Sequence, residues 1–135
     1  MGKSSREKGK RGEREVRDLW QRFRPLARRS GHEQAQGVAG AADVDVGPGY
    51  AVEVKRYKRL SWTVAKQALA QAEAVTEHPG RGHDVPIAFL REDKGRWLCL
   101  LDADQLLAMI EALDKHGRNL TRRELDHRPD GAADD

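Results

Sequence analysis

Residues 42–59 have the sequence Ala-Asp-Val-Asp-Val-Gly-Pro-Gly-Tyr-Ala-Val-Glu-Val-Lys-Arg-Tyr-Lys-Arg. The Gly-Pro-Gly segment is typical of a turn, and the alternating valines on either side of it predict two short strands that pair as a hairpin. Alternate side chains of a strand point to opposite faces, so Val52 and Val54 face one way while Glu53 and Lys55 face the other. The hairpin therefore predicts acidic groups and an ammonium on one surface, a candidate site for a metal ion and a phosphate.

The composition indicates one small domain that does not enter a membrane. The chain has 135 residues, of which 38% are apolar, 35% charged and only 5% aromatic, so we expect an aliphatic, alanine-rich core. No apolar run approaches the length of a membrane span, and the single cysteine, Cys99, in an apolar run that suggests burial, excludes an internal disulfide framework. We therefore expect a cytoplasmic protein with no membrane partner.

Basic residues are concentrated near the N-terminus. The net charge is only +3, but residues 1–29 contain eleven Lys or Arg and four Asp or Glu, a local balance of +7. A second basic run ends the hairpin. This distribution is typical of proteins that bind a phosphate backbone, although a solvated basic face with a flexible arm would give the same pattern. The candidates for contact with DNA phosphates are Lys8, Lys10, Arg11, Arg14, Arg56, Lys58 and Arg59.

The remaining periodicity predicts an α/β domain with a mixed central sheet of about five strands flanked by helices. A flexible basic arm (1–8) and a charged, flexible tail (117–135) are expected to flank a domain at 9–116. Within it we expect a helix at 10–24 that Pro25 stops, a weak strand at 25–29, a loop at 30–41, a helix at 62–77 that Ser61 caps, a hairpin at 85–101 and a helix to Asp114 with an inward apolar stripe.

The candidate chemistry of the hairpin is metal-assisted phosphodiester hydrolysis. Mg²⁺ takes oxygen ligands and retains several waters, so Asp43 and Glu53 can supply its protein ligands. Lys55 could orient the attacking water and stabilise the anionic transition state. A Glu-x-Lys on a strand is usually just a pair of charged side chains on a solvent-exposed face. Here it follows Asp43 and precedes a basic run, and an upstream helix carries Glu13 and Glu15.

Three segments together resemble the archaeal-type Holliday junction resolvases of the PD-(D/E)xK nuclease superfamily. They are Lys-Gly-Lys-Arg-Gly-Glu-Arg-Glu-Val at 8–16, Asp43, and Glu-Val-Lys at 53–55, and the resemblance spans about residues 8–101. In that family a Glu-Arg pair opens the first helix four residues after a Lys-Gly, and its glutamate assists the metal site. The resemblance thus implies that Glu13 assists directly or through water, that Asp43 and Glu53 bind the metal, and that Lys55 completes the motif.

The resemblance also implies the wider function. It implies a restriction-endonuclease-like core, Mg²⁺ as cofactor with Mn²⁺ as a substitute, branched double-stranded DNA as substrate, and a homodimer that makes paired symmetric nicks leaving 5′-phosphates and 3′-hydroxyls. A downstream helix of the family carries polar residues near the site, for which Gln67 and Gln71 are the candidates. The glycines lack the arrangement of a phosphate-binding loop, so no nucleotide cofactor is expected.

Several alternatives stay open at this level. Ala42 replaces the proline of the superfamily motif, and Asp45 is a second acid on the same strand face as Asp43. Periodicity does not choose between Glu13 and Glu15, and first-turn glutamates can simply complement a helix dipole. The substrate could instead be linear, flapped or mismatched DNA, or the protein could be a DNA-binding module without catalysis.

Overall fold

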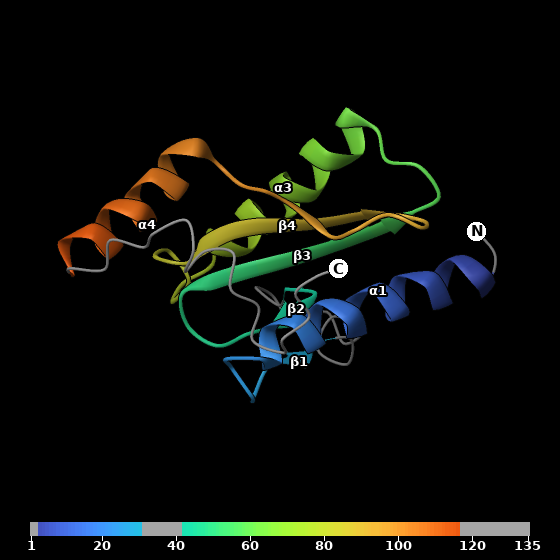
Figure 1. Cartoon of the computed structure of the whole chain (residues 1–135), viewed down its shortest axis with the longest axis horizontal. Helices are drawn as coiled ribbons and strands as arrows, with labels where there is room; N and C mark the ends of the chain where they lie inside the picture. The colour runs from blue at the N-terminus through green and yellow to red at the C-terminus, as the bar shows by residue number, and fades with distance from the viewer. Residues whose placement is uncertain (1–2, 31–41, 117–135) are drawn as a thin grey trace, which may run out of the picture. The chain divides into compact units, whose positions relative to one another are not determined.

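The computed structural model describes residues 3–30 and 42–116. Residues 31–41 of the expected loop and the expected tail at 117–135 lie outside the described residues. The chain divides into two units, one up to Asp102 and one from Ala103 onward. Its elements are α1 (Lys3–Gln21), β1 (Arg28–Arg29), β2 (Val44–Asp45), β3 (Tyr50–Tyr57), α3 (Trp62–Thr76), β4 (Val85–Glu92), β5 (Leu98–Leu100) and, in the second unit, α4 (Ala103–Lys115) (Figure 1).

Five strands form one mixed sheet in the order β1-β2-β3-β4-β5, which confirms the predicted α/β class. The predicted 42–59 hairpin is present: β2 and β3 are antiparallel and Val44 pairs with Val52. The two long strands, β3 and β4, are parallel over eight residue pairs, and α3 connects them. β5 then returns antiparallel to β4, so the predicted second hairpin is also confirmed.

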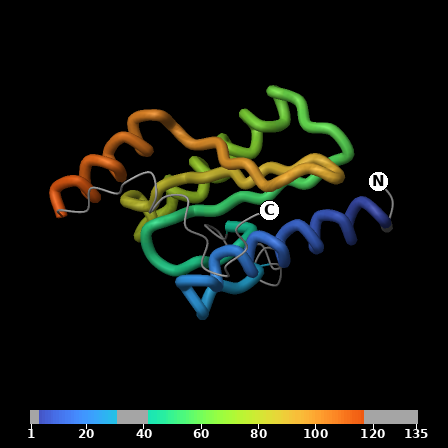
Figure 2. Tube along the Cα trace, in the orientation of Figure 1, coloured from blue at the N-terminus to red at the C-terminus, as the bar shows by residue number. Residues whose placement is uncertain are grey.

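The two faces of β3 pack against different helices, as the alternation of its side chains requires. Val52 and Val54 belong to one buried cluster with Val16 and Trp20 of α1. Ala51 on the other face packs with Val75 of α3. The path of the chain in Figures 1 and 2 shows α1 and α3 each running alongside the central strands. The acidic side chain of β3, Glu53, therefore lies on the face that α3 covers with alanines: Ala65, Ala68 and Ala72.

The helix predicted at 62–77 agrees with α3 in its bounds and its cap. The helix predicted at 10–24 differs in its bounds from α1. The side chain of Ser61 accepts a 3.1 Å hydrogen bond from the Val64 N–H, as predicted. The expected flexible arm at 1–8 is instead helical from Lys3 onward. A long-range ion pair between Lys8 and Asp93 holds this first part of the helix to the sheet, and sequence periodicity does not reveal such contacts.

Two expectations about burial were wrong. Cys99 is exposed, because β5 is an edge strand whose residues are only partly covered. The apolar stripe of α4 was expected to face inward, yet α4 has no buried residue. An amphipathic pattern predicts the helix but does not say whether anything covers its apolar face. In the described ranges, no helix has both the length and the apolar character needed to cross a bilayer.

Candidate active site

Strand pairing brings Asp43 and Glu53 together. Val44 pairs with Val52, so the residue before β2 lies beside the middle of β3. The Asp43 carboxylate accepts a 2.8 Å hydrogen bond from the Val54 N–H and a hydrogen bond joins the Asp43 and Glu53 carboxyl groups. Glu53 is only 6% exposed, which makes it one of two buried polar residues in the described part of the chain.

The surroundings of Glu53 favour its protonated form. Burial raises the pKa of Glu53 to about 9, with the hydrogen bond and negative charge of Asp43 acting in the same direction and Lys55 opposing them. At neutral pH, Glu53 is therefore protonated and bonded to Asp43. A bound divalent cation would reverse this preference, because it favours ionised carboxylates.

The structure places Glu13, and not Glu15, beside this pair. Burial and then the charge of Asp43 raise the pKa of Glu13, while its hydrogen bond with Arg29 lowers it. The Arg29 Nε donates to Glu13 Oε1 at 3.1 Å. We call Glu13, Asp43 and Glu53 the acidic cluster. Its three carboxyl groups come from α1, the start of β2 and the middle of β3, with the Lys55 charge acting on two of them.

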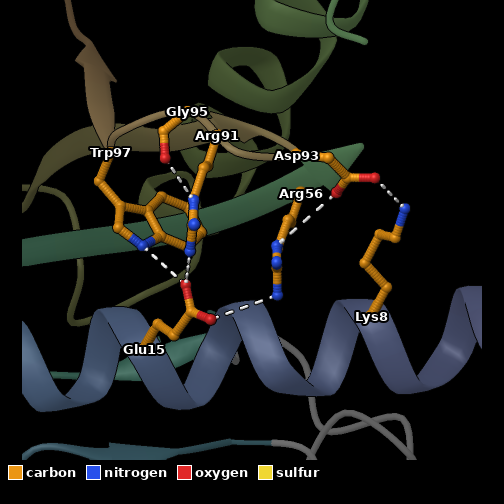
Figure 3. A network of polar contacts seen from close by, with 7 residues as sticks. All are labelled: Lys8, Glu15, Arg56, Arg91, Asp93, Gly95 and Trp97. Carbon is orange, nitrogen blue, oxygen red and sulfur yellow. Dashed lines mark hydrogen bonds and ion pairs between the residues drawn. The ribbon is translucent and has the colours of Figure 1, made fainter. Parts of the chain in front are cut away.

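Glu15 lies in a separate network of polar contacts, shown in Figure 3. Residues two apart on a helix point roughly 200° away from each other, which explains the different surroundings of the two glutamates. Glu15 accepts hydrogen bonds from Arg91, from Trp97 Nε1 at 3.0 Å and from Arg56 Nη1 at 3.2 Å. Glu15 therefore ties α1 to β3 and β4, and does not face the acidic cluster.

Asp45, the alternative to Asp43, has structural partners of its own. Its Oδ1 accepts a 3.0 Å hydrogen bond from the Gly47 N–H in the turn, and its Oδ2 lies 3.5 Å from Arg28. Asp45 lines a hollow beside Phe23 and Pro48, whereas Asp43 lines the cleft that contains Glu13 and Lys55. The geometry thus selects Asp43 over Asp45 as the member of the acidic cluster.

A cleft of about 520 Å³ opens beside the acidic cluster. One wall is α1 and the other is the C-terminal part of β3. The cleft is lined by Ser5, Lys8, Gly9, Glu13, Asp43, Val54, Lys55, Arg56, Tyr57, Lys58 and Arg59. The cleft thus combines carboxyl groups with a basic rim. This combination suits a phosphodiester, which needs a cation near the reacting phosphate and basic groups along the backbone.

Two glycines of α1 shape this cleft. A Cβ at Gly12 would lie 3.1 Å from the Cβ of Arg56 and 3.4 Å from Trp97, so the missing side chain lets α1 approach β3 closely. A Cβ at Gly9 would meet nothing within 4 Å, and Gly9 lines the cleft. In the Lys-Gly-Lys-Arg-Gly sequence, Gly12 therefore allows close packing, whereas Gly9 borders the open space of the cleft.

The predicted DNA-binding residues divide into three groups. Lys58 and Arg59 are exposed on the cleft rim. Lys10 and Arg11 are exposed on α1, and Arg14 there is half-buried. Lys8 and Arg56 line the cleft but have acidic partners within the chain. The accessory candidates Gln67 and Gln71 are exposed on α3 and are not among the residues that line the cleft.

Sequence reasoning missed three contributors to this region: Arg29, Arg91 and Asp93. Arg29 pairs with Glu13 from 16 positions away, and Arg91 contacts Glu15 from 76 positions away. Neither contact leaves a spacing signal in one sequence. The only local sign of a positive charge near the site at this edge of the sheet is the pair of adjacent arginines in the short strand β1.

Comparisons with protein-family models, curated proteins and solved structures found no match for this chain. Within residues 3–30 and 42–116, no three His, Cys, Asp or Glu side chains form a ready-made metal-binding group. Mg²⁺ does not require such a group, since one or two carboxylates and several waters commonly hold it. The donor set here, a buried Glu53 joined to a half-buried Asp43 with a third carboxyl group nearby, fits that type of coordination.

The raised pKa of Glu53 predicts an unusual pH dependence in the metal-free protein. The folded-state pKa of Glu53 is about 9 against an ordinary 4.5, so its contribution to stability is complete below pH 4.5 and is lost as the pH rises through 9. Urea unfolding in a chelator should show the free energy of unfolding falling by on the order of 4 kcal/mol between pH 5.5 and 9, relative to Glu53→Gln. Parallel profiles for the two proteins would contradict the buried, protonated Glu53.

Proposed function

We propose that this protein is a Mg²⁺-dependent endodeoxyribonuclease that resolves four-way DNA junctions by paired nicks. The observation that carries the proposal is the acidic cluster, two of whose carboxyl groups, Glu13 and Asp43, line a basic-rimmed cleft together with Lys55. Solvated strand decoration would not explain a Glu53 that is 6% exposed and hydrogen-bonded to a second carboxyl group. A binding module without catalysis would have no need of that costly arrangement.

The residues of the cluster have distinct proposed roles. Asp43 and Glu53 would hold Mg²⁺, and Glu13 would contribute directly or through a water. The bound cation would lower the pKa of a coordinated water and offset negative charge on the scissile phosphate. Arg29 holds the Glu13 carboxylate from β1 through its 3.1 Å hydrogen bond, so we propose it as a positioning residue.

Lys55 lines the cleft beside the carboxylates and would act on the phosphodiester itself. Its ammonium can donate hydrogen bonds to the attacking water and to a non-bridging phosphate oxygen, where negative charge increases in the transition state. The water oxygen would bond to phosphorus as it gives up a proton to solvent, the bond from phosphorus to the 3′-oxygen would break, and the 3′-oxygen would take a proton from another water. The products are a 5′-phosphate and a 3′-hydroxyl.

The junction as substrate follows from the sequence resemblance, and it requires two copies of the chain. A four-way junction must be nicked on two opposed strands, which a twofold-symmetric homodimer with one acidic cluster in each copy can do. Binding should depend on phosphate contacts and on DNA shape, because the cleft rim offers basic side chains for the backbone. Mn²⁺ should replace Mg²⁺.

The test compares substrates of matched length. A labelled four-way junction and a linear duplex are incubated with the protein in Mg²⁺ or in chelator, and the cut positions are mapped on each strand. The proposal expects Mg²⁺-dependent nicks at symmetric positions on two opposed strands of the junction and little cutting of the duplex. Equal cutting of both would instead support a general nuclease, and no cutting with any divalent cation would support a DNA-binding module.

A further inference from the structure

Three charged side chains from distant parts of the chain meet at the rim of the cleft. Lys8 comes from α1, Arg56 from β3 and Asp93 from the turn between β4 and β5, and Figure 3 shows Asp93 facing both cations. Lys8 Nζ lies 2.8 Å from Asp93 Oδ2. Both cations also line the cleft that Glu13 and Asp43 of the acidic cluster line.

The match between Asp93 and its two partners is incomplete. Arg56 Nε and Asp93 Oδ1 lie 4.0 Å apart, too far for a hydrogen bond. Both atoms are buried and have no hydrogen-bond partner among the described residues. Glu15 accepts from Arg56 Nη1 at 3.2 Å and so fixes the guanidinium, with Nε directed at Asp93. The Arg56 Nε–H is therefore a fixed donor to which Asp93 makes no hydrogen bond.

We propose that Lys8 and Arg56 form a binding site for a DNA backbone phosphate, and that the Asp93 carboxylate occupies this site in the free protein. This inference rests on the proposed function and names one phosphate subsite of the same cleft. A phosphate carries the same sign of charge as the carboxylate and more acceptor oxygens, so it can satisfy both Lys8 and the Arg56 Nε. Asp93 then acts as an internal competitor of DNA.

The exchange requires only a side-chain rotation. The backbone of the turn is fixed, since the Asp93 N–H donates to the Tyr57 carbonyl at 3.0 Å and the Gly95 N–H to the Glu92 carbonyl at 2.9 Å. The side chains of Lys8 and Asp93 are each 34% exposed, so Asp93 can turn toward solvent. Partly exposed ion pairs contribute little stability, and phosphate can therefore displace this one.

The test measures junction affinity in chelator, where no cleavage occurs, at several salt concentrations. Asp93→Asn should bind a labelled four-way junction roughly 3- to 10-fold more tightly than the unaltered protein at low salt, with a salt dependence steeper by about one counterion. Glu7→Gln is the matched control. It removes one acid from the same helix, where Glu7 forms an exposed 3.8 Å pair with Lys10, and should change affinity less than about twofold.

The gain should depend on Lys8. In the Asp93→Asn background, Lys8→Gln should return the affinity to that of the unaltered protein or below it, and Asp93→Ser should reproduce the gain if the asparagine variant folds poorly. Affinity of Asp93→Asn equal to or weaker than that of Glu7→Gln would overturn the inference and leave the proposed function intact. Failure of the unaltered protein to bind the junction would overturn both.

Discussion

Asp43→Asn and Glu53→Gln should each lower the rate of junction cleavage by at least roughly 100-fold, because each removes a charged oxygen ligand from the proposed cation site. Binding of the junction should persist, since the basic residues of the cleft rim remain. Asn at 43 keeps an oxygen that can accept the Val54 N–H, so the fold should be preserved. Single-turnover cleavage in Mg²⁺, with binding measured in chelator, separates the two effects.

Asp45→Asn is the matched control for Asp43→Asn. Both changes neutralise an aspartate next to or in β2, but Asp45 faces Arg28 and the Gly47 N–H outside the cleft. Its exposed ion pair contributes little, so cleavage by Asp45→Asn should change less than about fivefold. Near-normal cleavage by Asp43→Asn together with an inactive Asp45→Asn would contradict the assignment and identify Asp45 as the ligand.

Glu15→Gln should unfold more easily than the unaltered protein, by roughly 2–4 kcal/mol, because it leaves two guanidinium groups without their shared carboxylate. The side chains concerned, Arg56 and Arg91, are only 11% and 22% exposed. Urea unfolding at pH 7 measures the loss. The folded fraction of Glu15→Gln should still cleave DNA, since Glu15 does not face the acidic cluster.

Glu13→Gln should show the opposite pattern. Burial and the charge of Asp43 disfavour the ionised form of its carboxyl group. Neutralising this group should therefore leave the free energy of unfolding unchanged or raise it. Cleavage should fall by at least about 10-fold if Glu13 assists the metal site as proposed. A stable, inactive Glu15→Gln beside a fully active Glu13→Gln would reverse the two roles. It would contradict the placement of Glu13 in the acidic cluster and of Glu15 outside it.

The strands and their register were predictable because they depend on local alternation. The valines of residues 42–54 predicted the hairpin, and the pairing of Val44 with Val52 follows from placing those valines in the core. The same alternation predicted Glu53 and Lys55 on one face. The Ser61 cap likewise depends on residues only three positions apart.

Periodicity could not choose between neighbouring acids, because the choice depends on contacts between distant segments; only the family resemblance favoured Glu13 and Asp43. Glu15 is held by Arg56, Arg91 and Trp97, which lie 41, 76 and 82 positions away. The same reason explains the helical start of α1 at Lys3, where Lys8 pairs with Asp93 across 85 positions. A single sequence contains no signal for these pairs.

Calorimetric titration with Mg²⁺ can measure whether the acidic cluster binds a divalent cation. We expect one saturable site that releases close to one proton near pH 8, since the cation displaces the proton of Glu53. Binding should be lost in Glu53→Gln and kept in Asp45→Asn. Equal Mg²⁺ binding by the unaltered protein and Glu53→Gln, without proton release, would contradict the account.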